Sequence, residues 1–135
     1  MPRVTFDKLT LGATYSRPFL SRLWGYKGYQ AIARGVVTPH GHKAILLFVT
    51  REKQSAAEPY DDRLESTRLH WEGPTDHFAE QRMLQADSQG DEIHLFHRDR
   101  HHSDFAYLGR LRLVDTDLRT QRPSRFTFEL LDYHV

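Results

Sequence analysis

The most histidine-rich stretch of the chain is "HLFHRDRHHSDF", residues 94 to 105, which holds four of the nine histidines and two arginines. Imidazole rings in such density suit three kinds of chemistry. They can bind a metal, they can act as acid and base in a nuclease, or they can join arginines in contacting a phosphate backbone. The spacing of the side chains, and the elements on either side, decide among the three.

The spacing argues against a metal site. His97, His101 and His102 are the candidate ligands, and His40 and His42 form a second close pair, but none of the standard zinc spacings occurs and the chain has no cysteine. His94 and His97 are three apart on an expected strand and therefore point to opposite faces. We expect no metal and no other cofactor, and a metal-dependent enzyme remains as a third alternative.

The familiar nuclease and hydrolase centres are also absent. The chain has no asparagine, which a His-Asn-His centre needs, and no lysine is preceded two residues earlier by an acid. There is no Gly-x-Ser-x-Gly nucleophile motif. The carboxylates Asp61, Asp62 and Glu65 lie beside Arg63, which is typical of a solvated loop cluster. We expect no catalytic residues and no enzyme activity.

The charges are segregated along the chain, although the net charge is only +1. Residues 1 to 50 carry seven basic side chains and one acidic one, whereas residues 51 to 92 carry five basic and eleven acidic ones. No acidic side chain lies between Asp7 and Glu52. A basic segment of this length suits a polyanionic partner, and a solvated basic face balanced by the acidic middle is the alternative.

The N-terminal third predicts two short helices. Ser16 is a favourable N-cap, Pro18 suits a first turn and Gly25 a helix end, so the first helix occupies about residues 17 to 24. A second helix ends before Gly35. The pair forms either a helix-turn-helix or a cap on a sheet.

The remainder predicts a sheet. Residues 43 to 50 form a continuous apolar run, typical of a strand buried on both faces, and residues 91–98, 105–115 and 124–133 alternate as strands do. Residues 51–63 predict a loop, residues 65–71 a strand and residues 77–87 a helix. Strict alternation places Phe105, Tyr107, Leu111 and Leu113 on one face, and Leu108 with Arg110, Arg112 and Val114 on the other.

These elements indicate an α+β protein. We expect a small, curved, mixed and mostly antiparallel sheet or partial β-barrel, with short N-terminal helices and one mid-chain helix. The 135 residues suit a single domain, 1–135. No apolar run is long enough for a membrane span and no secretory signal is visible, so we expect a cytoplasmic protein.

Aromatic residues recur beside polar and charged ones at expected loop ends, in four groups. The groups lie around Tyr26, Tyr60, Trp71 and the arginines of residues 98–102. Arginine can contact phosphate oxygens, an aromatic ring can stack on an exposed base, and a carboxylate can accept a hydrogen bond from a base amino group. The alternative for Trp71, and for Tyr29 beside the first group, is simple packing in the core.

Several stretches resemble an uncharacterised domain family that is found fused to His-Asn-His endonucleases and to restriction-type helicases. They are "LWGYKGYQAIARGVVTP", "KAILLFVTREKQ", "YDDRLESTRLHWEG", "GDEIHLFHRDRHHSDFAYLGRL" and "RPSRFTFEL", within about residues 15 to 131. The organisation is similar to that of PUA-like and SRA-like modules. The resemblance implies a curved mixed sheet and a role in reading modified DNA for restriction and phage defence. No nuclease is present here, so the chain can be an excised domain.

From these residues and this resemblance we expect a non-catalytic module that binds double-stranded DNA and targets an associated nuclease or helicase. It would read a modified base, flipped or not, or a phosphorothioate backbone. The expected backbone contacts are Arg17, Arg22, Lys27, Arg98, Arg100, His101 and His102. The expected base pocket consists of Tyr26, Tyr60, Asp62, Trp71 and Glu72. The alternative is a protein-interaction domain of a restriction-type helicase or nuclease that does not read DNA.

Overall fold

The structure is a computed structural model that describes residues 2–51, 63–65, 67–74, 76–100, 102–119 and 123–133. Its elements, in chain order, are β1 (Thr14–Tyr15), α1 (Arg17–Trp24), the 3-10 helix η1 (Tyr29–Ile32), β2 (Val36–Val37), β3 (Ala44–Thr50), β4 (Arg63–Glu65), β5 (Arg68–Glu72), α2 (Glu80–Leu84), α3 (Ala86–Gln89), β6 (Glu92–Arg98), β7 (Phe105–Asp117) and β8 (Arg125–Leu130). Within these ranges, every helix is too short or too polar to cross a membrane.

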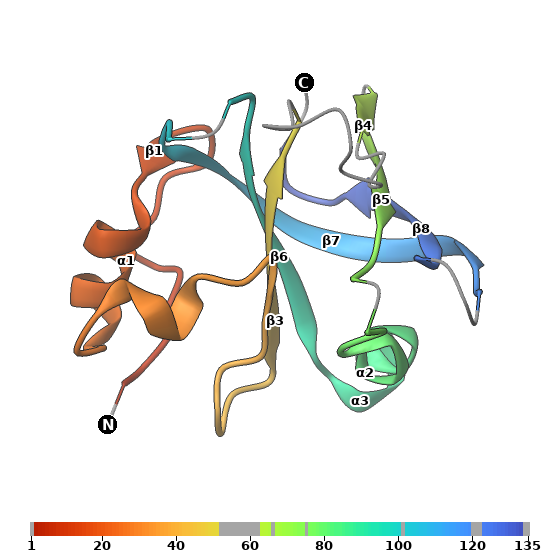
Figure 1. The fold of residues 1–135 in the computed structure, drawn as a ribbon, viewed down its shortest axis with the longest axis horizontal. Coiled ribbons are helices and arrows are strands. Elements are labelled where there is room, and N and C mark those ends of the chain that lie inside the picture. Colours follow the sequence, from red (N-terminus) through yellow and green to blue (C-terminus); the bar gives the residue numbers. More distant parts are fainter. Residues whose placement is uncertain are drawn as a thin grey trace.

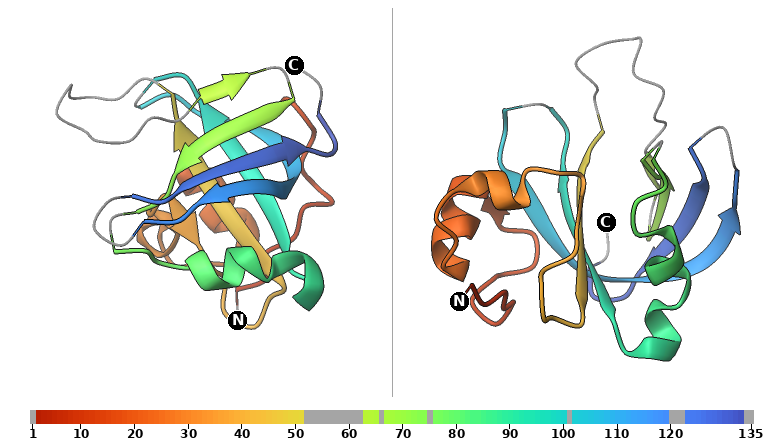
Figure 2. Two further views of the ribbon diagram at one scale, coloured as in Figure 1. Left: turned by 90° about the vertical axis from the view of Figure 1, so that its right-hand side faces the viewer. Right: turned by 60° about the horizontal axis from the view of Figure 1, so that its bottom comes forward.

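One curved sheet organises the molecule. Its strands follow the order β2-β3-β6-β7-β8-β5-β4, and β1 pairs with the start of β7. Among the described strands the β3–β6 pair is parallel, and the other pairs are antiparallel. The sheet bends without closing, with α1 on one side and α2 and α3 on the other (Figure 1, Figure 2). The expected α+β class and the mostly antiparallel curved sheet are confirmed.

The N-terminal helices cover one face of the sheet. The Ser16 hydroxyl accepts a hydrogen bond from the Phe19 N–H at 3.1 Å, and Gly25 ends α1 in the left-handed conformation, as predicted. With β3, β6 and the start of β7 they bury what we call the helix-side cluster: Val4, Leu20, Trp24, Ile32, Val37, Leu46, Phe48, Phe96, Phe105 and Tyr107. The two helices therefore cap a sheet. The second is a four-residue 3-10 helix, which is too short for a recognition helix.

The other face of the sheet encloses a larger core. This interior cluster contains Val36, Ile45, Leu47, Val49, Leu69, Trp71, Met83, Ala86, Ile93, Leu95, Leu108, Leu111, Phe126, Phe128 and Leu130. Strand β3 supplies both clusters and is buried at every position, as its continuous apolar run predicted. The single helix expected over residues 77–87 is two short helices, because Gln85 leaves the helical conformation between α2 and α3.

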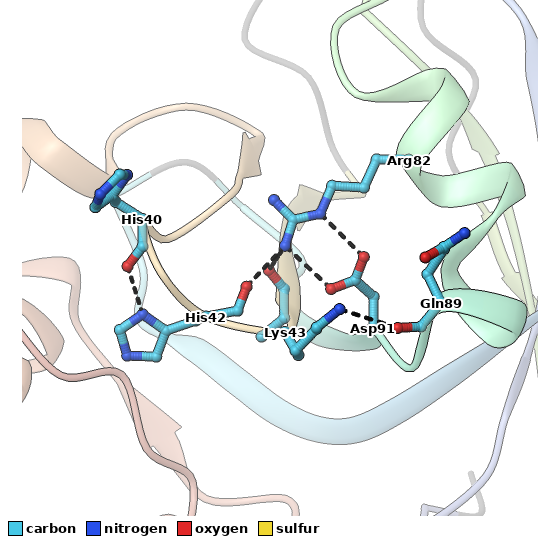
Figure 3. A network of polar contacts seen from close by, with 7 residues as sticks. His40, His42, Lys43, Arg82, Gln89 and Asp91 are labelled. Atoms are coloured by element: carbon cyan, nitrogen blue, oxygen red, sulfur yellow. Dashed lines mark hydrogen bonds and ion pairs between the residues drawn. The ribbon is translucent and has the colours of Figure 1, made fainter.

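A polar network fixes these short helices to the sheet (Figure 3). The Arg82 guanidinium donates to both carboxylate oxygens of Asp91 at 3.1 Å and to the carbonyl of His42 at 2.8 Å. Lys43 donates to the carbonyl of Gln89 at 3.2 Å. Because these bonds join α2 and α3 to the beginning of β3 and to the segment entering β6, they hold Met83 over the interior cluster.

Strand β7 carries one extra residue at Leu108 and another at Val114, so it bulges twice. Before the first bulge, Phe105 and Tyr107 face the helix-side cluster; beyond it, Leu111 faces the interior cluster together with Leu108. The prediction that Phe105, Tyr107, Leu111 and Leu113 share a face is therefore wrong. Strict alternation fails because Gly109 adopts a φ of 81° and reverses the faces.

The sequence pattern also missed or merged some elements. Strands β1 and β2 have two residues each, too few to show an alternation. The strand expected over 65–71 is part of the β4–β5 hairpin. The loop expected over 51–63 lies mostly outside the described residues.

A histidine is buried within the helix-side cluster. His94 is 2% exposed and stacks on Phe6 with ring centroids 3.5 Å apart. Its Nδ1 lies 2.8 Å from the Tyr107 hydroxyl and its Nε2 lies 3.0 Å from Glu92, so a neutral ring protonated on Nε2 satisfies both partners. Burial lowers the pKa of His94, and the hydrogen bond to Glu92 opposes that shift only in part.

Substitution of Gly109 by alanine tests the bulge. An added Cβ would lie 2.8 Å from Cβ of Asp132 and 2.9 Å from Leu11, in addition to the left-handed φ. Gly90 is the matched control, because its φ is 78° and nothing lies within 4 Å of an added Cβ. We expect urea denaturation to show a loss of about 1–2 kcal/mol for Gly90→Ala. Gly109→Ala should lose at least ~1 kcal/mol more through overpacking. Equal losses would contradict the close approach.

The buried His94 predicts a pH dependence of stability. Its pKa is lower in the folded than in the unfolded chain, so folding favours the neutral ring. The stabilisation is complete above the unfolded pKa, near ~6.5, and is lost as pH falls toward the folded pKa. We expect the free energy of unfolding to fall from about pH 7 to about pH 5, and to fall less steeply in His94→Gln. His40 is exposed, so the control variant His40→Gln should show the same change of unfolding free energy with pH as the parent. If His94→Gln also shows the same change as the parent, His94 is not the source of the pH dependence.

Candidate nucleic-acid interface

The histidine-rich stretch, residues 94 to 105, forms part of the β6–β7 hairpin, and residues 99–104 connect the two strands. The predicted position of the arginines at this hairpin end is confirmed. Arg98, however, folds back onto the sheet: it donates to the Thr50 hydroxyl at 2.8 Å and to the Ser103 carbonyl at 3.2 Å. Its guanidinium lies 4.3 Å from the ring centroid of Phe105.

Arg17, from the first turn of α1, reaches the same ring. Its guanidinium lies 4.9 Å from the centroid of Phe105 and 4.7 Å from that of Phe48. It donates to the carbonyl of Ile32 at 2.9 Å, which holds it in place. Burial, and then the charge of Arg98, lower the pKa of Arg17 to about 10, which still leaves it charged at neutral pH. Two of the expected phosphate-binding residues thus contact the same aromatic ring.

The other expected backbone contacts lie around this pair. Arg22 is exposed in the last turn of α1, and Lys27 is exposed just beyond it. Arg100 and His102 are exposed in the hairpin connection, where His102 has a φ of 67°. His101 lies outside the described residues. The described members therefore come from two segments, α1 with its following turn and the β6–β7 hairpin, which meet at Phe105.

A second feature is a pocket of about 210 Å³ at the far end of β7. It brings together two residues expected to form the base pocket, Trp71 and Glu72. Its lining is completed by His70, Asp115, Thr116, Asp117, Arg125, Phe126 and Thr127. The register explains the assembly, because His70 and Asp115 both pair with Thr127, and Glu72 and Asp117 both pair with Arg125. The second bulge of β7 turns Asp115 and Asp117 toward this lining.

The pocket is rich in hydrogen-bond acceptors. The Glu72 side chain is only 8% exposed, and its carboxylate lies 3.5 Å from the Arg125 guanidinium. Asp117 pairs with Arg119 at 3.0 Å, and the His70 ring lies 3.7 Å from a carboxylate oxygen of Glu65. The lining contains three carboxylates and one arginine, so the pocket is acidic. They are Glu72, Asp115, Asp117 and Arg125. Such a pocket can accept hydrogen bonds from an amino group and disfavours a phosphate.

The remaining expected pocket residues are not joined to these two. Tyr26 packs against the helix-side cluster, whereas Trp71 belongs to the interior cluster and lies tilted against Phe126, with ring centroids 5.5 Å apart. The two rings lie on opposite faces of the sheet, so they do not wall one pocket. Burial raises the pKa of the Tyr26 hydroxyl. Tyr60 and Asp62 lie outside the described residues.

The histidines do not converge on a metal site within the described ranges, where no group of three His, Asp or Glu side chains could hold an ion. His42 is held by backbone groups, because its Nε2 accepts from the Val4 N–H at 3.1 Å and its Nδ1–H donates to the His40 carbonyl at 2.8 Å. His94 and His97 face opposite sides, as predicted: His94 pairs in register with Leu46, and His97 with Val49.

Sequence reasoning missed part of both features. Phe48 and Phe105 support the two arginines, and Asp115, Asp117 and Arg125 line the pocket. Arg17 and Arg98 are far apart in the sequence, and no local spacing signals that both contact the ring of Phe105. The pairing of Asp115 and Asp117 with β8 depends on the bulge at Val114, for which the sequence offers no glycine or other marker.

Comparison with solved structures shows the fold. The chain is similar to the SRA domain of SUVH5, solved in complex with fully methylated CG DNA, with a TM-score of 0.58, 10% identity and coverage of 100% of this chain and 98% of that one. It is also similar to the DNA modification-dependent restriction endonuclease AspBHI, with a TM-score of 0.50 and 16% identity. That match covers 76% of this chain but only 63% of AspBHI.

The sheet is therefore of the SRA type, as the resemblance in the sequence implied. A search of the curated proteins finds no matching relative. The sequence profile of one family matches residues 9–130, which is most of the chain. The chain belongs to the family described as domain of unknown function DUF3427.

Proposed function

We propose that this chain is a non-catalytic DNA-binding module that recognises modified DNA and directs an associated nuclease or helicase to it. The observation that carries the proposal is the match in fold, over the whole chain, to an SRA domain solved with fully methylated CG DNA. The likeness to a modification-dependent restriction endonuclease supports the same role. The two features described above supply the chemistry that such a module requires.

The backbone of the duplex would contact the basic side of the molecule. Arg17, Arg22, Lys27, Arg98, Arg100, His101 and His102 are the proposed contacts. Neutralising phosphates with these cations releases counterions, so affinity should fall steeply with salt concentration. The segregation of charge supports this orientation, because residues 8 to 51 contain no carboxylate side chain that would repel a phosphate.

The modified base would enter the acidic pocket. Glu72 is the proposed reader of its polar edge, because a buried carboxylate accepts strongly from a base amino group and Arg125 already holds it in place. Trp71 lines the same pocket from the core side. Tyr60 and Asp62 remain proposed contributors, and Tyr26 is a proposed contact outside this pocket. Extruding a base costs a few kcal/mol, which backbone contacts and stacking must together offset.

A panel of duplexes with one sequence tests the proposal. The duplexes are plain, or carry methylated, hydroxymethylated or glucosylated bases, or phosphorothioate linkages. We expect fluorescence anisotropy at low salt to show binding, with at least one modified duplex bound more tightly than the plain one. Equal affinity for all of them would overturn modification reading, and no binding at low salt would overturn the DNA role.

Replacement of the pocket carboxylate tests where the base is read. Glu72→Gln keeps the shape but weakens the acceptor, so we expect it to lose about 1–3 kcal/mol of discrimination between modified and plain duplexes. Glu129→Gln is the matched control, since Glu129 also pairs with an arginine, Arg112 at 3.0 Å, but lies outside the pocket. Discrimination unchanged in Glu72→Gln, with the fold intact by circular dichroism, would remove this residue from the reading site.

A further inference from the structure

Arg17 and Arg98 bring two positive charges to the same aromatic ring, Phe105. Both guanidiniums contact the same ring, at 4.9 Å and 4.3 Å, so their separation cannot exceed these two distances together. A separation within this limit is short enough for both guanidiniums to contact one phosphate group. Phe48 meets Phe105 edge to face, with centroids 5.1 Å apart, and so packs directly against this ring.

No carboxylate in the described part of the chain pairs with either cation. Of the two acids in the described hairpin connection, Asp99 pairs with Arg51 at 3.1 Å, and Asp104 forms no ion pair with either guanidinium. The charge that acts on Arg17 is that of Arg98, which is repulsive. Two partly desolvated cations that have no counter-ion among the described residues are stabilised when an anion joins them.

Both guanidiniums also keep donors for a ligand. The hydrogen bonds of Arg17 to the carbonyls of Ile32 and Arg34 come from Nε and Nη2, and those of Arg98 to Thr50 and Ser103 come from Nε and Nη1. Nη1 of Arg17 and Nη2 of Arg98 make no hydrogen bond to any described residue. In each guanidinium, two nitrogens are held by hydrogen bonds to the protein, and the third nitrogen can donate to a ligand. A guanidinium held in this way is preorganised to bind a phosphate.

We propose that Arg17 and Arg98 form a single site for one phosphate group, with Phe105 as its floor and one guanidinium donating from each side. The assignment of this group to the DNA backbone rests on the proposed function. The site itself rests on the geometry and would also accept a free anion of the same chemistry, such as pyrophosphate. It therefore differs from an exposed basic surface, on which each cation would act independently.

Thermal denaturation with pyrophosphate tests the site without DNA. Compared with chloride at equal ionic strength, pyrophosphate should raise the Tm of the parent, because a ligand that binds only the folded state stabilises it. Arg98→Gln, which can still donate to Thr50, should lose most of that rise. Arg112→Gln is the control, since it removes the same charge from an exposed position in the other half of β7 and should keep the rise. No rise in the parent, or an undiminished rise in Arg98→Gln, would overturn the site.

Duplex binding then tests the source of the phosphate. The logarithm of the binding constant should depend less steeply on the logarithm of salt concentration in Arg98→Gln than in Arg112→Gln, by about 0.9 for each phosphate that the variant no longer neutralises. If the parent binds modified DNA selectively and both variants keep its slope, the DNA assignment of the site is wrong while the reader role stands. If pyrophosphate stabilises the parent through Arg98 but no duplex binds, the reader role is wrong while the phosphate site stands.

Discussion

Strand β7 must serve two hydrophobic clusters on opposite faces of one sheet, and the rest of the structure depends on how it does so. A regular strand presents alternate residues to each face throughout its length. The extra residue at Leu108 and the left-handed Gly109 exchange the faces, so that Phe105 and Tyr107 bury under α1 while Leu111 joins the interior. Without this exchange, one of the two cores would receive charged side chains such as Arg110.

Strand β7 also carries the two candidate sites at its two ends. In the first half of β7, Phe105 lies in the helix-side cluster and becomes the support for two arginines from distant segments. In the second half, the bulge at Val114 turns Asp115 and Asp117 toward Arg125 and Glu72. A cationic site and an acidic pocket thus occupy opposite ends of one strand. Two of the three pocket carboxylates, Asp115 and Asp117, belong to β7 itself and lie outside the acid-rich stretch of residues 51 to 92.

The sequence predicted what depends on local pattern. Strands β3, β6, β7 and β8, the capped helix α1 and the hairpin after Arg98 all follow from apolar runs, alternation or capping residues. It did not predict the faces of β7, because a bulge changes the period without changing the composition. Nor did it show that Arg17 and Arg98 share a ring, since that contact joins residues far apart in the chain. Glu72 and Trp71 were expected together because they are adjacent, whereas Tyr26 was expected with them and lies across the sheet.

The distance between the two ends of β7 constrains any duplex that contacts both. Twelve residue steps along a strand span at most about 40 Å, and the curvature of the sheet shortens this. One turn of a DNA duplex is about 34–36 Å long. A duplex that contacts both the paired arginines and the acidic pocket would therefore meet them within about one turn. Placing the carboxylates far from the phosphate site is what makes this compatible with a polyanion, because an acidic pocket beside the arginines would neutralise them and repel the backbone.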